Sequence, residues 1–195
     1  APNYVLEALA QNMKPGSWLH PVTTDKDTLL AIAQNMHPGS SLAPYPSVPK
    51  DTMLAIAQHM NPGSCLMPHS SVSKDTWVAI AQYMKPGSIL CPQTEDRETL
   101  VAIAQHMNPG SYLVPHSSVS KDTMLAMAKN MNHDGLFLPQ TQDRETLIEI
   151  AQHMNQGSWL IPHSSVSKDT LVAIAQHMHP GSYLIPLSKD TDTLL

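Results

Sequence analysis

The stretch Ser73–Pro92, SKDTWVAIAQYMKPGSILCP, contains one complete structural repeat of this chain. An apolar stripe with the spacing i, i+3, i+4 and i+7 runs through it: Trp77, Ile80, Ala81 and Met84. This spacing is typical of one face of an amphipathic helix. Ser73 precedes the stripe and is a good N-cap residue, whereas proline cannot continue a helix and glycine tolerates a left-handed turn. The stretch therefore predicts a helix of about three turns that ends at Pro86-Gly87.

The residues after each Pro-Gly predict a short strand. They read Ser-x-Leu-x-Pro, as in Ser64–Pro68 and Ser111–Pro115, which is too short for a second helix and alternates as a strand does. One position of this pattern is apolar in every repeat: Leu19, Leu42, Leu66, Leu90, Leu113, Phe137, Leu160 and Leu184. We expect this row to face inward. Proline is tolerated at the end of each strand, since it removes a hydrogen-bond donor only where the pairing stops.

This unit recurs along the whole chain. Methionine returns at steps of 23 or 24 residues, at Met13, Met36, Met60, Met84, Met107, Met131, Met154 and Met178. A period of this length marks a solenoid, in which each repeat buries its apolar face against its neighbours. One helix and one strand per repeat, always in that order, imply parallel strands with the helices behind them. The predicted fold is an α/β solenoid of eight 23–24-residue strand-helix repeats with one parallel sheet, forming a single repeat domain over residues 1–195.

The sixth repeat departs from the pattern in the spacing of its glycine. At His133-Asp134-Gly135 the Pro-Gly pair becomes Asp-Gly, and the glycine comes one residue later. Asp-Gly is an equally good turn former. We therefore expect a local variant of the turn, shifted by one residue, and no break in the solenoid.

The repeat resembles the leucine-rich repeat superfamily, and within it the α/β horseshoes of the ribonuclease-inhibitor type. The family pattern L-x-L-x-x-N-x-I followed by an amphipathic helix is similar to Leu66–Val72 followed by Ser73–Met84. Three features differ: Pro68 replaces the second leucine, Ser70 stands where the family has its buried asparagine, and the repeat is shorter. The resemblance covers the whole chain. It implies a curved ligand-binding scaffold and carries over no catalytic residue.

Composition and charge exclude several classes of function. The chain of 195 residues is 42% hydrophobic and 14% charged, which is too apolar for a disordered protein. Its net charge of −5 and the absence of a basic stripe argue against nucleic acid as a partner. No apolar run approaches the roughly 20 residues that cross a bilayer. The start Ala1–Tyr4 lacks the features of a signal peptide, and no compartment follows from the sequence.

The ends of the sequence predict additional chain or a partner. The sequence does not begin with methionine, and Lys189–Leu195 starts a ninth helix that stops after its first apolar residues. A terminal repeat exposes its stacking face unless it is capped. We therefore expect a segment of a longer array, with self-association through the open C-terminal face as the alternative.

The two cysteines are too few for a disulfide framework. Cys65 and Cys91 lie in adjacent repeats at positions that differ by two, so a bridge between them would run diagonally across neighbouring strands. We expect free thiols that serve as small apolar side chains.

Histidine is the residue type that most invites a metal or catalytic interpretation, since the chain has eleven. Four precede a repeat methionine (His59, His106, His153 and His177), and three open a return loop (His69, His116 and His163). Equivalent residues in alternate repeats lie roughly 10 Å apart, too far to share one ion. The recurring Ser, Asp and Thr are typical of caps and turns, whereas an active site needs one asymmetric constellation. We predict no catalytic residue, no metal site, no cofactor and no enzymatic activity.

The predicted binding surface is the strand face opposite the inward row, whose positions are unusually apolar. Its candidate contact residues are Trp18, His20, Met67, Ile89, Tyr112, Val114, Leu136, Trp159, Ile161 and Tyr183. A large exposed apolar patch usually marks an interaction site, although strands of a parallel sheet are also apolar where both faces are covered. We predict a non-enzymatic scaffold that holds a protein or peptide on this concave face. The alternatives are a structural or self-associating module and, ranked below it, histidine-mediated metal binding.

Overall fold

The computed structural model of the protein describes residues 3–187. In this part of the chain eight helices alternate with eight strands of two residues each. The helices are α1 (Asn3–Gln11), α2 (Lys26–Asn35), α3 (Lys50–His59), α4 (Lys74–Tyr83), α5 (Arg97–His106), α6 (Lys121–Asn130), α7 (Arg144–His153) and α8 (Lys168–His177). The strands are β1 (Trp18–Leu19), β2 (Ser41–Leu42), β3 (Cys65–Leu66), β4 (Ile89–Leu90), β5 (Tyr112–Leu113), β6 (Leu136–Phe137), β7 (Trp159–Leu160) and β8 (Tyr183–Leu184).

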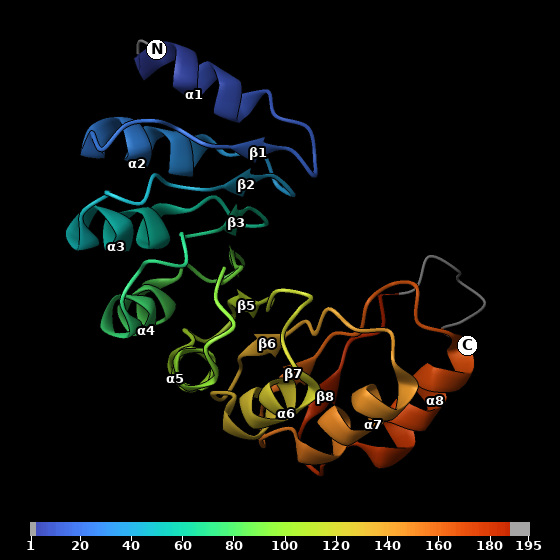
Figure 1. Ribbon diagram of the computed structural model, residues 1–195. Helices are drawn as coiled ribbons and strands as arrows, with labels where there is room; N and C mark the ends of the chain where they lie inside the picture. The colour runs from blue at the N-terminus through green and yellow to red at the C-terminus, as the bar shows by residue number, and fades with distance from the viewer. Residues whose placement is uncertain (1–2, 188–195) are drawn as a thin grey trace.

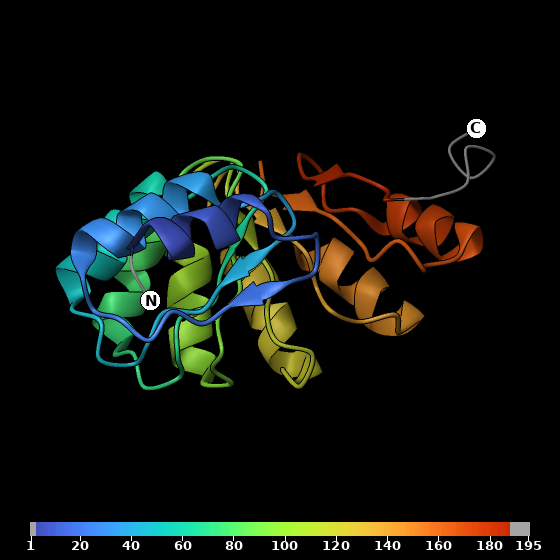
Figure 2. The ribbon, with the colours of Figure 1, turned by 90° about the horizontal axis from the view of Figure 1, so that it is seen from above.

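The strands form one open parallel sheet in sequence order from β1 to β8. The register is constant, so that Cys65 of β3 lies opposite Ile89 of β4 and Leu66 opposite Leu90. Within residues 3–187 no pairing joins β1 to β8, and the sheet does not close on itself. The strands follow the inner side of an arc and the helices its outer side (Figures 1 and 2). The predicted α/β architecture, with one helix and one parallel strand per repeat, is confirmed.

The helices begin at the predicted caps. Ser73 Oγ accepts a hydrogen bond from the backbone N–H of Thr76 at 3.3 Å, and the Asp96 carboxylate accepts one from the N–H of Thr99 at 2.8 Å. The Thr99 hydroxyl and then the Thr99 backbone N–H hold the pKa of Asp96 below its usual value. Helix α3 is an exception, because Pro49 occupies its N-cap and makes no side-chain capping bond.

Each helix from α2 to α8 ends before the turn that contains Pro-Gly or the residues equivalent to it, which corrects the predicted helix end. Helix α4 ends at Tyr83, and the next residue, Met84, has a ψ of 131°. The cause is a bond to the preceding repeat, since the N–H of Lys85 donates to the carbonyl of Ala57 at 3.0 Å. Ala57 lies in the last turn of α3, where carbonyls have no partner within the helix. In each of these repeats the N–H after the methionine thus donates to a free carbonyl of the preceding helix. Its own helix has ended by that point.

A second series of hydrogen bonds, the glycine ladder, joins the turns of consecutive repeats. The N–H of Gly39 donates to the carbonyl of Gly63 at 2.7 Å, and the N–H of Gly63 donates to that of Gly87 at 2.7 Å. Gly39 and Gly63 have φ values of 81° and 82°. Glycine adopts this left-handed conformation without the steric cost of a Cβ, so the ladder explains why glycine has this position in seven of the eight repeats.

Asp134 takes the glycine position of this ladder in the sixth repeat, with a φ of 57°. The N–H of Gly110 donates to the Asp134 carbonyl at 2.9 Å, and the N–H of Asp134 donates to the Gly157 carbonyl at 3.0 Å. The turn is therefore in register with its neighbours, and the expected shift of one residue is wrong. Aspartate tolerates the left-handed conformation, which leaves Gly135 at the position where neighbouring repeats have a buried serine.

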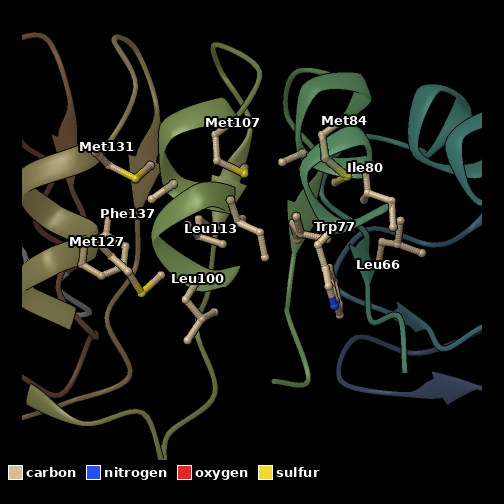
Figure 3. Packing of buried hydrophobic residues seen from close by; sticks show 14 of the residues in the cluster. Leu66, Trp77, Ile80, Met84, Leu100, Met107, Leu113, Met127, Met131 and Phe137 are labelled. Carbon is tan, nitrogen blue, oxygen red and sulfur yellow. The ribbon is translucent and has the colours of Figure 1, made fainter. Parts of the chain in front are cut away.

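The core lies between the sheet and the helices (Figure 3). The inward strand positions Leu66, Leu90 and Phe137 are fully buried, as predicted, and belong to one cluster with the helix residues. Met84 is buried in the same cluster although it lies just beyond its helix. Trp77 is buried, and its indole Nε1 has no hydrogen-bond partner among residues 3–187.

Cys65 and Cys91 form a disulfide, which corrects the prediction of free thiols. Their Cα atoms are 6.5 Å apart, within the range that a bridge spans. Cys65 lies on β3, and Cys91 follows β4 directly. Because the two positions differ by two residues, both side chains lie on the strand face and meet diagonally across the two strands.

No helix in residues 3–187 is long and apolar enough to cross a membrane. The segment Lys189–Leu195 lies outside the described residues. Self-association through the C-terminal face therefore stays a prediction.

We expect Asn108 to stabilise the junction between the fourth and fifth repeats. Its Nδ2 donates to the Met84 carbonyl at 2.8 Å, and Asn108→Ala leaves that carbonyl without this donor. The free energy of unfolding should fall by about 1 kcal/mol, as measured by urea denaturation followed by circular dichroism. Lys85 has the same position in the preceding repeat and an exposed side chain. Lys85→Ala is the matched control, with an expected change below about 0.5 kcal/mol; equal losses in the two variants would contradict this role for Asn108.

Candidate functional site

The predicted contact residues lie along the strand face in two rows that cross the sheet. The first row contains the first residue of each strand, with Tyr112 opposite Leu136 and Leu136 opposite Trp159. Exposure differs greatly along the face: Trp18 is 62% exposed, Tyr183 is 48% exposed and Ile161 only 3%. His20 is exposed, and the remaining predicted residues are partly buried: Met67, Ile89, Tyr112, Val114, Leu136 and Trp159. The face is therefore not one uniform apolar patch, and Ile161 is too buried to contact a partner.

A cavity of about 590 Å³ opens at the carboxyl ends of β1 to β4. Its lining comes from the ends of these strands and the loops after them: Trp18, His20, Pro21, Val22, Ala43, Pro44, Tyr45, Pro46, Met67, His69, Ser70 and Gln93. Trp18, His20 and Met67, which were predicted for the strand face, meet here. In open α/β sheets, ligands bind in the crevice outside the carboxyl ends of the strands, so the position of this cavity suits a binding site.

Sequence reasoning missed the loop side of the cavity, above all Tyr45 and Pro46. A signal was present, because the loop after β2 reads Pro-Tyr-Pro-Ser-Val-Pro where the loop after β3 reads Pro-His-Ser-Ser-Val-Ser. Tyr45 and Pro46 thus replace residues equivalent to His69 and Ser70. Residues that differ from the repeat consensus thus form this wall of the cavity, whereas the consensus residues form the scaffold.

His69 is the histidine of a return loop that lines the cavity. Its Nδ1 accepts a hydrogen bond from the backbone N–H of Ser71 at 3.1 Å. A neutral imidazole that accepts at Nδ1 carries its proton on Nε2, which is then free to donate. The same bond recurs at His116 and His163, so it first serves to shape the loop. Of these three histidines only His69 lines the cavity described above.

Two aromatic side chains stay open to solvent beside the cavity. Trp18 is 62% exposed and Tyr45 is 48% exposed. The imidazole of His20 lies against the indole of Trp18, with ring centroids 6.2 Å apart and planes tilted by 50°. No aspartate, glutamate, lysine or arginine is among the lining residues. The site thus combines uncovered aromatic surface with neutral polar groups.

A smaller hollow of about 320 Å³ lies at the other end of the sheet, lined by Gly110, Tyr112, Asp134, Leu136, Trp159 and Ile185. It gathers three further residues predicted for the strand face. Within residues 3–187 no group of three or more His, Cys, Asp or Glu side chains is placed to hold a metal ion.

The comparisons with known proteins give no family. No protein-family model matches the chain, and no curated protein matches it. Among solved structures, tryptophan synthase from M. tuberculosis is 11% identical and matches with a TM-score of 0.34, over 96% of this chain and 89% of that chain. A putative fructose-1,6-biphosphate aldolase from Coccidioides immitis is 8% identical with a TM-score of 0.33, over 94% of this chain and 80% of that chain. A protein from Aquifex aeolicus VF5 is 8% identical with a TM-score of 0.32, over 95% of this chain and 87% of that chain.

These comparisons contradict the predicted function. The tryptophan synthase and the putative aldolase are named as enzymes, not as leucine-rich repeat or other binding proteins. We therefore withdraw the prediction that the chain is a non-enzymatic scaffold for a protein or peptide. We also withdraw its alternatives, namely a structural module, a module whose apolar strand face pairs with another copy, and histidine-mediated metal binding. The physical reason lies in the strand face, which is partly packed and hollowed instead of uniformly apolar and open. At these TM-scores and identities no activity, substrate or residue role passes to this chain.

Proposed function

We propose that the protein binds a small, uncharged molecule with an aromatic ring in the cavity at the carboxyl ends of β1 to β4. The observation that carries this proposal is the lining, which joins uncovered aromatic rings with neutral polar groups and contains no charged side chain. Its volume of about 590 Å³ lies within the range of roughly 300 to 1,000 Å³ typical of small-molecule sites.

The aromatic walls supply the affinity in this proposal. Trp18 and Tyr45 keep much of their ring surface in contact with water in the free protein. A ring stacked on either side chain removes apolar surface from water, at roughly 25 cal/mol per Å², and gains the offset or edge-to-face contacts that aromatic pairs prefer. The contact between His20 and Trp18 limits the freedom of the indole. The side chain therefore loses less conformational entropy when a ligand binds.

The polar groups set the orientation of the ligand. His69 Nε2 donates, and the Ser70 hydroxyl donates or accepts. Gln93 Nε2 is bonded to the Cys91 carbonyl at 3.2 Å, which leaves its side-chain oxygen as an acceptor. These groups match a hydroxyl or carbonyl substituent on the ring. A charged substituent has no counter-charge among the lining residues and would lose its hydration without compensation.

Benzyl alcohol is the probe that tests this site, with benzoate and benzylammonium as charged counterparts of similar size. We expect benzyl alcohol to shift the NMR resonance of the Trp18 indole N–H, assigned by its loss in Trp18→Phe, and the charged compounds to bind more weakly. Tyr45→Ala should weaken binding about tenfold, the effect of roughly 1.4 kcal/mol of lost ring contact.

Tyr183→Ala is the matched control for this experiment. Tyr183 is as exposed as Tyr45, at 48%, but it lies on β8 at the far end of the sheet. Its removal should leave the affinity for benzyl alcohol unchanged. Equal losses in both variants, or tighter binding of benzoate, would refute the proposed site.

We also propose that the solenoid is a short variant of the leucine-rich repeat horseshoe. The inward leucine or phenylalanine of each strand, the single helix per repeat and the curvature of the stack support this (Figure 1). An asparagine ladder supports it as well, although it follows the helix instead of occupying Ser70: Asn61, Asn108, Asn132 and Asn155 each donate to the methionine carbonyl of the preceding repeat.

Small-angle X-ray scattering tests this architecture. An open arc has a longer maximum dimension than a closed barrel of the same length, because its first and last strands do not meet. We expect a scattering profile that fits the open arc. A profile that fits only a closed, barrel-like particle would contradict it.

A further inference from the structure

The turn at Asp134 differs from its neighbours in one way that the fold does not require. The equivalent position in the other repeats is a glycine with positive φ, as at Gly110 and Gly157. Asp134 keeps both hydrogen bonds of the glycine ladder, at 2.9 and 3.0 Å. The backbone therefore gains nothing from aspartate, and glycine would adopt this conformation with less strain. What aspartate adds is a carboxylate on the strand-face side of the turn.

That carboxylate borders the hollow of about 320 Å³ at the C-terminal half of the sheet. Tyr112 of β5 and Trp159 of β7 stand on either side of Leu136 of β6 in the same row, and all three line this hollow with Asp134. Two aromatic residues and one aspartate thus line a common space of the size of a small organic molecule.

The indole of Trp159 is held in a fixed orientation. It stacks on the ring of Tyr183, with centroids 4.3 Å apart and planes inclined by 21°. The stack covers one face of the indole and limits its rotation. An aromatic face carries the negative end of the ring quadrupole, and it attracts cations within about 6 Å of the ring centre.

The charge of the Asp134 carboxylate is not cancelled by a lysine or arginine among the lining residues of the hollow. Its neighbour is His133, whose Nδ1 lies 2.9 Å from one carboxylate oxygen and whose side chain is largely exposed. Because His133 Nδ1 contacts only one oxygen of the carboxylate, the second oxygen is left to accept a hydrogen bond. The hollow therefore presents a negative charge beside aromatic faces.

We propose that this hollow is a second binding site, which takes a small organic cation that carries an ammonium group. The carboxylate of Asp134 supplies the counter-charge, and the rings of Trp159 and Tyr112 contact the alkyl groups around the nitrogen. This pairing of an anion with aromatic faces recognises substituted ammonium ions better than inorganic cations, which lose more hydration on binding. The site is independent of the cavity at the carboxyl ends of β1 to β4.

Choline is the probe, and 3,3-dimethylbutan-1-ol, which has the same shape without the charge, is its control. The readout is the NMR resonance of the Trp159 indole N–H, assigned by its loss in Trp159→Phe. We expect choline to shift this resonance in a saturable manner and to leave that of Trp18 in place. The uncharged control should bind at least about tenfold more weakly, the effect of removing a cation–π contact and its counter-charge.

Asp134→Gly is the decisive variant, because it restores the residue found at this position in the neighbouring repeats and should fold at least as well as the parent chain. We expect it to lose about tenfold in affinity for choline while its thermal unfolding midpoint is unchanged or higher. Tyr112→Leu should also weaken binding. Unchanged binding in Asp134→Gly, equal binding of the uncharged control, or no saturable shift at Trp159 would each overturn the proposal. None of these results bears on benzyl alcohol binding at Trp18.

Discussion

The hydrogen bonds that join consecutive turns are the constraint on which the rest of the structure depends. At each junction the residue after the methionine donates its N–H to an alanine carbonyl in the last turn of the preceding helix, as Lys85 does to Ala57. These carbonyls would otherwise lack a partner. The glycine amides form a parallel ladder beside them. Together the two ladders fix the spacing and rotation between repeats, and a sheet with strands of only two residues keeps a constant register over eight strands because of them.

The same hydrogen bonds determine where the two candidate sites lie. Since every repeat leaves its helix at the same point, every strand ends at the same edge of the sheet, and the loops after neighbouring strands lie side by side. A residue that departs from the repeat in one loop therefore lies beside the loops of the neighbouring repeats. Tyr45 and Pro46 build one wall of the larger cavity in this way, and Asp134 brings a carboxylate to the smaller hollow without altering the ladder. The repeated residues make the scaffold, whereas departures from the repeat contribute to the lining of both proposed sites.

The sequence predicted what depends on a single repeat and failed where neighbouring repeats interact. The helix stripe at Trp77 and Ile80, the cap at Ser73 and the inward row that includes Leu66 are local patterns, and the structure has them as expected. The early helix end at Tyr83, the disulfide between Cys65 and Cys91 and the unshifted turn at Asp134 all arise from contacts between repeats. Part of the lining of the larger cavity was predicted, namely Trp18, His20 and Met67. Its loop wall was not predicted, because the prediction rested on the apolar strand positions alone. The function inferred from those positions was wrong.

Hydrogen exchange at the turn glycines tests the central claim most directly. Gly39 lies in an exposed turn outside any helix or strand, so its amide would exchange at once in a turn without cross-repeat bonds. The account predicts that the amides of Gly39, Gly63, Gly87 and Gly157 are protected to the same degree as the amides in the middle of α4, as measured by NMR after transfer into deuterium oxide. Exchange of these four amides at the rate of an unstructured chain, with the helix amides still protected, would contradict it.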